Sequence, residues 1–211
     1  MRITKYTHSC LRIEHDGAVL VVDPGGWSER SALTGADAVL ITHEHPDHLA
    51  VDRVADTLGK RPDLRVYAHA EVLPKLAAVA GAVTPVAAGT EFTAAGLTVR
   101  AYGGQHAVIH PDIPRIANLG FLISDGAGTV YTPGDSFTVP DEPVETLFVP
   151  LHAPWLKVSE AIDFVRAVHP DRAFALHDFL LNETGAALYD SLHERLNGTR
   201  YARVAPGTTL D

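Results

Sequence analysis

The sequence predicts a mixed α/β fold in which β-sheets are covered by helices. Nine short apolar or alternating runs have the length and composition of β-strands, and four longer segments have helical periodicity. Many strands with a few helices in 211 residues favour layers of sheet and helix around a shared core. No linker or change in composition divides the chain, so we expect residues 1–211 to form a single domain.

The expected strands follow one another along the chain, and turn residues separate several of them. The strands cover residues 11–14, 18–23, 38–41, 66–68, 97–102, 119–124, 130–132, 147–151 and 173–176. Asp16-Gly17, Ala95-Gly96 and Asp125-Gly126 lie between neighbouring runs and predict hairpins. Hairpins indicate an antiparallel or mixed sheet.

The expected helices lie between some of these strands. They cover residues 49–58, 72–80, 159–168 and 184–196. Gly59 and Gly81 would end the first two helices, and Gly198 lies just beyond the last one. Ser159 is predicted to be the N-cap of the third helix.

Composition and charge argue against several functional classes. The single cysteine, Cys10, rules out an internal disulfide framework, and we expect a packed core thiol in a cytoplasmic protein. The first residues lack the apolar core of a signal peptide, and no stretch is long enough to span a bilayer. A formal net charge of -9 without a basic run argues against nucleic acid as a partner. We therefore expect a small-molecule substrate, no nucleic acid and no membrane.

The densest group of metal-binding side chains follows the apolar run 38–41. His43, His45, Asp47 and His48 combine imidazole with carboxylate, which suits a divalent ion such as zinc. In an extended segment His43 and His45 point to the same side, and Asp47 and His48 lie at the start of the following helix. A solvated turn in which Asp47 caps that helix would explain the aspartate but not three histidines. The segment can serve two adjacent ions.

Other metal-binding side chains follow other predicted strands. Asp135, His152 and His177 each lie just beyond an apolar run, and His106 follows residues 97–102 after two glycines. Loops at strand ends, held by a rigid scaffold, are where binding residues collect. If these strand ends share one edge, the residues converge with residues 43–48.

The pattern resembles the metallo-β-lactamase-fold superfamily of metal-dependent hydrolases. In that family the motif His-x-His-x-Asp-His is followed by a third histidine, an acidic residue in a Gly-Asp turn and a final histidine, which His106, Asp135 and His177 match. The resemblance covers almost the whole chain and implies a four-layer αβ/βα sandwich with the site at one edge of the two sheets. Residues 7–10 and 106–115 are most similar to the small group related to ascorbate-6-phosphate lactonases.

The resemblance also implies a ligand set for two divalent ions. The first ion would be bound by His43, His45 and His106, the second by Asp47, His48 and His177, and Asp135 would bridge them. Zinc is the default from the ligand types, and manganese or iron stays open because affinity order and cellular supply both intervene.

Three residues are candidates to support these ligands. In the family, an aspartate at the position of Asp23, in the Asp23-Pro24-Gly25 turn, is usually such a support, although a simple turn explains it equally well. His8 and Asp178 are further candidates, because metal-bound histidines need hydrogen-bonding partners.

Four residues are candidates to bind substrate. Arg115 could hold a carboxylate or phosphate through two hydrogen bonds, or could form a surface ion pair. His110 shares its proline-containing loop. His152 and Trp155 could wall the pocket, with Trp155 offering an apolar face, or could have a packing role.

These features predict hydrolysis. Two divalent ions can hold a bridging hydroxide and polarise the carbonyl or phosphoryl group it attacks, and Asp47 could double as the proton acceptor, as the family implies. The ions carry more positive charge than Asp47, Asp135 and one hydroxide neutralise, so the site favours a small anionic ester, lactone or phosphodiester. The alternative is a metal-bound oxidoreductase of the iron dioxygenase kind, or a non-catalytic ligand sensor. The sequence leaves open the substrate, the metal in vivo, the leaving-group acid and the oligomeric state, including a homo-oligomer.

Overall fold

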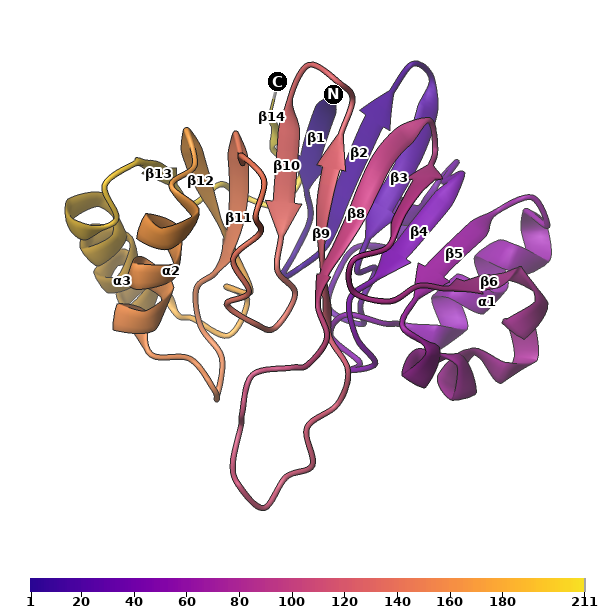
Figure 1. Cartoon of the computed structure of the whole chain (residues 1–211), viewed down its shortest axis with the longest axis horizontal. Coiled ribbons are helices and arrows are strands. Elements are labelled where there is room, and N and C mark those ends of the chain that lie inside the picture. Colours follow the sequence, from indigo (N-terminus) through magenta and orange to yellow (C-terminus); the bar gives the residue numbers. More distant parts are fainter. Residues whose placement is uncertain (211) are drawn as a thin grey trace.

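The chain is arranged in four layers, helix, sheet, sheet and helix, in a computed structural model that describes residues 1–210 (Figure 1). Two seven-stranded sheets face each other in the middle, and helices cover the outer side of each. The predicted mixed α/β class and four-layer αβ/βα sandwich are confirmed.

The first sheet carries segment 43–48, which contains four of the predicted metal ligands. Its order is β14-β1-β2-β3-β4-β5-β6, and the strands from β3 to β6 pair in parallel. The strands are β1 (Arg2–Lys5), β2 (Leu11–His15), β3 (Ala18–Val22), β4 (Ala38–Ile41), β5 (Arg65–Ala68), β6 (Val83–Pro85) and β14 (Thr209–Leu210). The hairpin of β2 and β3 turns through Asp16 and Gly17, both with positive φ, as predicted.

The second sheet has the order β13-β12-β11-β10-β9-β8-β7. Its strands are β7 (Glu91–Ala94), β8 (Leu97–Gly103), β9 (Leu119–Ser124), β10 (Thr129–Thr132), β11 (Thr146–Pro150), β12 (Arg172–Leu176) and β13 (Arg200–Ala202). Strands β7 to β10 pair antiparallel and β10 to β13 in parallel. The predicted hairpins at Ala95-Gly96 and Asp125-Gly126 are therefore confirmed.

Helices cover the outer faces of both sheets. Beside the first sheet lie η1 (Arg30–Leu33), α1 (Val51–Lys60) and η2 (Ala70–Ala82), and beside the second lie α2 (Val158–Val168) and α3 (Glu183–Leu196) (Figure 1). The helix expected over residues 72–80 is present, but η2 is a kinked 3-10 helix and not a regular α-helix. Pro74 lies inside it without a backbone N–H, and the backbone at Leu76 and Val79 leaves the helical region.

Two expected helix ends also differ from the structure. Ser159 is not the N-cap of α2, because the helix already begins at Val158 after the extended residue Lys157, which offers no side-chain cap. Gly59 lies within the last turn of α1 instead of ending it, since a glycine near a helix end costs only about 1 kcal/mol.

The core has three parts that correspond to the spaces between the layers. Leu20 of β3 and Phe121 of β9 belong to the cluster between the sheets. Val54 of α1 packs against the outer face of the first sheet, and Phe164 of α2 packs against the outer face of the second. Strand β4 is buried at all four positions because it is covered on both faces.

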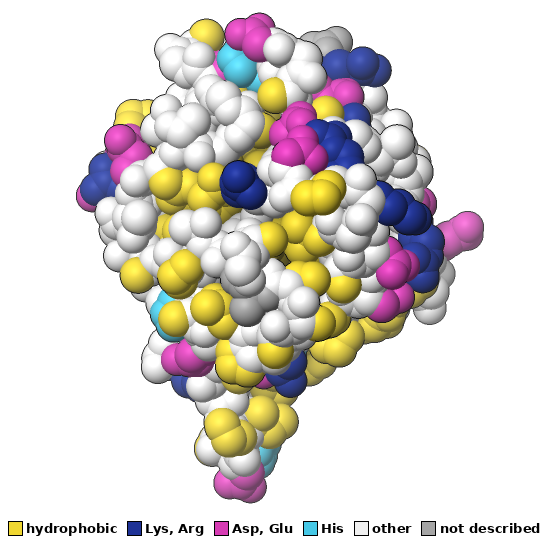
Figure 2. All heavy atoms as spheres, turned by 90° about the vertical axis from the view of Figure 1, so that its right-hand side faces the viewer, with side chains coloured by type: hydrophobic (Ala, Val, Ile, Leu, Met, Phe, Trp, Pro, Cys, Tyr) yellow, Lys and Arg dark blue, Asp and Glu magenta, His cyan; other side chains and the backbone are white. Residues whose placement is uncertain are grey.

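The layers bring the loops that follow β4, β8, β10 and β12 to one edge. The loop of residues 104–118 projects furthest beyond this edge (Figure 1) and forms the narrow tip in the space-filling view (Figure 2). Among the helices of residues 1–210, none is long and apolar enough to cross a membrane.

Candidate metal centre

Eight side chains form two adjacent clusters at this edge. The first cluster is His43, His45, His106 and Asp135, and the second cluster is His8, Asp47, His48 and His177. Within each cluster one donor atom from every residue lies within 4.8 Å of the others. His45 and Asp47 are partly exposed, and the other six are buried. All seven predicted ligands are thus brought together, and His8 joins them.

Asp135 lies between the two clusters. Its Oδ1 is 3.1 Å from Nε2 of His48, and its Oδ2 is 3.4 Å from Nε2 of His106 and 3.3 Å from Nε2 of His177. One carboxylate therefore touches histidines of both clusters, which is the arrangement that a bridging ligand requires.

Two glycines allow the loops to approach this closely. A Cβ on Gly25 would lie 1.7 Å from the carbonyl oxygen of Asp47. A Cβ on Gly134, where φ is +61°, would lie 2.3 Å from Oδ1 of Asn118. Because both positions admit only hydrogen, the turns that carry Asp23 and Asp135 can pack directly on their neighbours.

Ligands of the second cluster are held by a carboxylate and a backbone carbonyl. Asp23 accepts hydrogen bonds from the backbone N–H of Thr42 at 2.8 Å and its hydroxyl at 2.7 Å, and it lies 2.8 Å from Nδ1 of His48. Nδ1 of His177 donates to the carbonyl oxygen of His152 at 2.6 Å. Asp23 thus occupies the supporting position expected from the sequence.

Ligands of the first cluster are held by neutral groups. Nδ1 of His106 donates to the carbonyl oxygen of Ala107 at 2.6 Å, and Nδ1 of His43 lies 3.0 Å from the hydroxyl of Thr42. Nε2 of His43 lies 3.0 Å from Nδ1 of His45. The rings of His43, His45 and His106 therefore each turn one nitrogen toward the other two.

The pattern of satisfied and unsatisfied atoms fits bound metal. Within residues 1–210, the buried Nε2 atoms of His106 and His177 and Oδ1 of Asp135 make no well-directed hydrogen bond, although Asp135 lies 3.1 Å from His48, 3.4 Å from His106 and 3.3 Å from His177. Buried polar atoms without partners are rare, and each calls for a reason. Divalent ions bound by these atoms would supply it, because the opposite nitrogen of each ring is already fixed by a carbonyl.

His8 enters the second cluster through a strained backbone. Its φ is 66°, in the left-handed region. Its ring is buried, and the centroid of this ring lies 3.9 Å from the centroid of the His177 ring. Nε2 of His8 is 3.0 Å from Oδ2 of Asp47. The residue therefore both supports Asp47, as expected from the sequence, and lies among the potential ligands.

The electrostatic environment differs between the clusters. Burial lowers the pKa of His43 and His45, because desolvation disfavours the imidazolium form. Burial also opposes protonation of His48 and His177, but nearby carboxylates outweigh it: Asp135 and Asp23 raise the pKa of His48 well above 6.5, and Asp135 and Asp47 raise that of His177 to about 9. His48 and His177 of the second cluster thus favour the charged form more strongly than His43 and His45 of the first, whereas burial lowers the pKa of His8.

Trp155 is placed differently from the expected apolar wall of a pocket. It is buried, and its Nε1 donates to Oδ2 of Asp135 at 2.9 Å. Its ring packs against Phe137, with 5.2 Å between centroids. The indole therefore orients the shared carboxylate instead of offering an apolar face, because its N–H needs an acceptor when buried.

The remaining substrate candidates lie at different distances from the clusters. Arg115 donates through Nε to the carbonyl oxygen of His106 at 2.8 Å and, with His45 and His106, lines a cavity of about 20 Å³. The ring of His152 lies 5.9 Å from that of Tyr189, while its carbonyl holds His177. His110 is exposed and lies 3.6 Å from Asp112 of its own loop.

Asp178 is not a support for His177. Its Oδ1 lies 3.1 Å from Nζ of Lys5, whose side chain is completely buried. A buried ammonium group requires a paired carboxylate, so Asp178 is used there.

The sequence did not reveal the role of Asn118. Its Oδ1 accepts from the backbone N–H of Asp135 at 2.9 Å, and its Nδ2 donates to the carbonyl oxygen of Pro133 at 2.9 Å. These bonds fix the turn that presents Asp135. A polar residue immediately before the predicted strand 119–124 was the only local signal.

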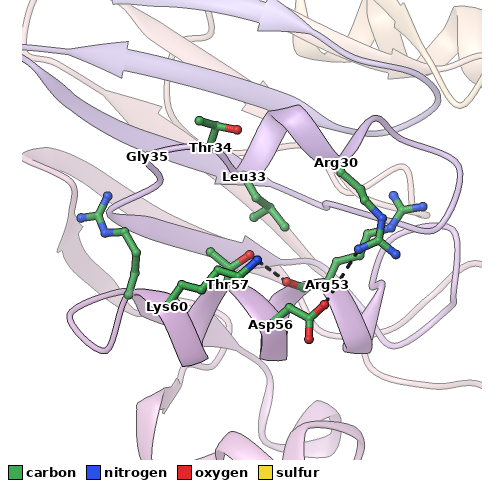
Figure 3. Close-up of a pocket in the computed structure, with 9 residues that line it drawn as sticks. Arg30, Leu33, Thr34, Gly35, Arg53, Asp56, Thr57 and Lys60 are labelled. Atoms are coloured by element: carbon green, nitrogen blue, oxygen red, sulfur yellow. Dashed lines mark hydrogen bonds and ion pairs between the residues drawn. The ribbon is translucent and has the colours of Figure 1, made fainter.

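Arg53 was also missed, and it holds the turn beside segment 43–48. Its guanidinium donates to the carbonyl oxygens of Gly25 at 3.1 Å, Gly26 at 2.9 Å and Ser28 at 2.6 Å. Arg53 lies on α1 beside a groove of about 260 Å³ that Arg30 of η1 also lines (Figure 3). The groove shares no residue with either cluster.

Known sequences related to this chain include metal-dependent hydrolases. A family model described as beta-lactamase superfamily domain matches residues 2–177. Protein Rv0786c of Mycobacterium tuberculosis is 39% identical over an alignment 214 positions long, which covers 100% of this chain and 94% of that protein. A UPF0173 metal-dependent hydrolase of Dinoroseobacter shibae is 29% identical, with 82% of this chain and 81% of that protein aligned.

Solved structures share the fold at low sequence identity. Igni18, a metallo hydrolase from Ignicoccus hospitalis, superposes with a TM-score of 0.77 at 18% identity and covers 99% of this chain and 97% of its own. CmlA, a diiron beta-hydroxylase from Streptomyces venezuelae, has a TM-score of 0.72 at 18% identity, and the match covers 99% of this chain and 53% of CmlA. The same fold therefore carries more than one chemistry.

Proposed function

Because the chain belongs to the beta-lactamase superfamily domain family, we propose that it is a binuclear metal-dependent hydrolase that cleaves a small anionic ester, lactone or phosphodiester. The metal-dependent hydrolase class has the support of the family match and of the relatives' names. The number of ions, zinc as the metal and the substrate class are our proposals.

The convergence of unsatisfied donor atoms carries the proposal of two ions. His106 and His177 lie in different clusters, each ring is fixed at Nδ1 by a backbone carbonyl, and each Nε2 is buried without a well-directed hydrogen bond to any of residues 1–210. Asp135 lies between the two nitrogens. Histidine and carboxylate ligands in this proportion suit zinc, while manganese and iron remain to be compared by experiment.

Two divalent ions held there would activate a water molecule at neutral pH and polarise the carbonyl or phosphoryl group that it attacks. The side chains of the chain have complementary tasks. Oδ2 of Asp47 lies 3.0 Å from Nε2 of His8 and 3.4 Å from Nε2 of His177, and Asp47 is partly exposed, so its carboxylate can accept a hydrogen bond from the attacking water and orient it. Trp155 and Asn118 hold Asp135 in place through its carboxylate and its backbone N–H.

The preference for an anionic substrate rests on local charge. The chain as a whole is acidic, with a formal net charge of -9. At the centre, however, the positive charge of two divalent ions would exceed the negative charge of Asp47 and Asp135, the two aspartates that face them. Arg115 lies beside His45 and His106 at a small cavity and adds a cation on that side. Small anions would therefore be attracted to the centre, whereas nucleic acid would be repelled by the rest of the surface.

A metal-replacement experiment tests the proposal. The protein would be stripped with a chelator, reloaded with zinc, manganese or iron, and assayed with p-nitrophenyl esters, lactones and bis(p-nitrophenyl) phosphate. We expect hydrolysis of at least one substrate class, lost on chelation and restored by a redox-inactive ion. Hydrolysis that survives complete removal of metal would refute the proposal.

A metal-bound oxidoreductase is the second candidate, because a diiron beta-hydroxylase shares the fold. The same preparations distinguish the two. Oxygen consumption that requires iron, without hydrolysis in any metal form, would favour the oxidoreductase. Metal binding with neither reaction would favour a ligand sensor.

A further inference from the structure

Two large aromatic side chains are exposed beside the second cluster. Trp27 is 41% exposed, Phe179 is 53% exposed, and Leu180, next in sequence, is 52% exposed. The rings of Trp27 and Phe179 lie 5.5 Å apart although 152 positions separate them in the sequence. A single exposed apolar residue needs no explanation, but two aromatic rings brought together from distant loops form a surface that can bind an apolar group.

This aromatic pair is continuous with the proposed metal centre. The ring of His8 lies 4.7 Å from that of Trp27 in an edge-to-face arrangement and 3.9 Å from that of His177. Nε2 of His8 also contacts Asp47. A single buried imidazole therefore separates the exposed rings from the predicted ligands, so a molecule attacked at the second cluster would extend across them.

Each aromatic residue stands on a backbone that is fixed from inside the fold. Arg53 binds the carbonyl oxygens of Gly26 and Ser28, the two neighbours of Trp27. Lys5 binds Asp178, the residue before Phe179. These contacts place both loops before any ligand arrives, which reduces the entropy lost on binding.

We propose that Trp27 and Phe179 form an apolar subsite that binds a phenyl or extended alkyl group of the substrate next to the bond that is cleaved. The proposal rests on the proposed hydrolase function for the position of that bond. The substrate class then narrows to an ester, lactone or phosphodiester that carries such an apolar group together with an anionic or polar head.

The first test measures binding and does not depend on turnover. The protein, loaded with metal as purified, would be titrated calorimetrically with 4-phenylbutyrate and with butyrate, which share a carboxylate but differ in the phenyl ring. We expect phenylbutyrate to bind about tenfold more tightly, the effect of burying roughly half of a phenyl ring. Trp27→Ala and Phe179→Ala should each reduce this ratio to about threefold or less.

A matched control and a conservative variant exclude a general loss of structure. Leu188→Ala removes a side chain that is 60% exposed on α3 and should keep the wild-type ratio. Trp27→Phe should restore most of the preference that Trp27→Ala loses, and melting temperatures would identify any variant that fails to fold. Equal binding of the two carboxylates by wild type, or an unchanged ratio in both alanine variants, would overturn the proposal.

The second test uses p-nitrophenyl acetate, butyrate, hexanoate and benzoate. KM should fall from acetate to hexanoate in wild type, and this trend should flatten in Trp27→Ala and Phe179→Ala. Wild type that hydrolyses all four esters with equal KM would contradict the subsite but leave the hydrolase intact. Wild type that prefers phenylbutyrate in the calorimeter but hydrolyses none of the esters would keep the subsite and count against the function.

Discussion

The two clusters of the candidate metal centre are supported in different ways. His48 of the second cluster pairs with the buried carboxylate of Asp23, whereas His106 of the first cluster donates to the backbone carbonyl of Ala107. Asp135 is common to both. A carboxylate behind a ligating histidine raises its basicity and fixes its orientation, so substitution of Asp23 should weaken the second site more than the first. The first site is less open to such substitutions because its supports are largely neutral or belong to the backbone.

The largest effect is expected from Asp135→Ala, which removes the group shared by both clusters. Bound metal should fall from about two ions per chain to less than one, and kcat/KM should fall about a thousandfold, because both ions lose a ligand and their common anchor. Mass spectrometry of the metal content and steady-state kinetics would measure this. Asp163→Ala, an exposed aspartate of α2, is the control. A variant that still holds both ions would show that Asp135 does not bridge.

Asp23→Asn should weaken the second site more than the first, because Asp23 contacts His48 directly but reaches His43 only through the hydroxyl of Thr42. The variant keeps the size of the side chain but loses the charge behind His48, so one ion should bind about 10- to 100-fold more weakly and the other should change much less. Stepwise zinc titration of the stripped protein against a competing chelator would resolve the two affinities. Asp37→Asn is the control, because it makes the same substitution at an aspartate that pairs with Arg61 away from both clusters. Equal weakening of both steps would mean that the sites are not independently supported.

Trp155→Phe should weaken both sites by a smaller factor. The substitution removes the N–H that orients Oδ2 of Asp135 but keeps an aromatic ring, and we expect about tenfold lower affinity for each ion. The same titration would be used. If the affinity falls at only one of the two binding steps, Asp135 contacts a single ion.

The smallest effect is expected from Arg115→Met, on the side of the first cluster. Removing an exposed cation should raise KM about fivefold for anionic esters and leave neutral esters unchanged, with kcat nearly constant. Parallel kinetics with a neutral ester and its carboxylated analogue would measure this. If both esters change by the same factor, Arg115 acts through its hydrogen bond to the carbonyl of His106 and not on the substrate.

Strands with continuous apolar runs were predictable, and short mixed strands were not. β4 was predicted over its full length because all four residues are apolar. β1 was missed because Ile3 is the only apolar residue in Arg2–Lys5, and its Lys5 is buried only through the distant partner Asp178. β14, with two residues, has no pattern of its own and pairs with β1 across the whole length of the chain.

The ligands could be read from the sequence more readily than their supports. The spacing of residues 43–48 is local, so the motif was visible without a fold. Trp155 and Asn118 act on Asp135 over 20 and 17 positions, and neither carries a local pattern that distinguishes it from a packing residue. Asp178 shows the opposite case, because its position next to His177 suggested a support, while a buried lysine at the other end of the chain determined its partner.

Metal stoichiometry tests the central claim most directly. Metal content would be measured by plasma mass spectrometry on protein purified without added metal, for wild type, His43→Ala and His48→Ala. The binuclear account predicts about two zinc or manganese ions per chain in wild type and about one in each variant, because each substitution removes a ligand of one cluster. One iron per chain in wild type, unchanged in His48→Ala, would contradict it.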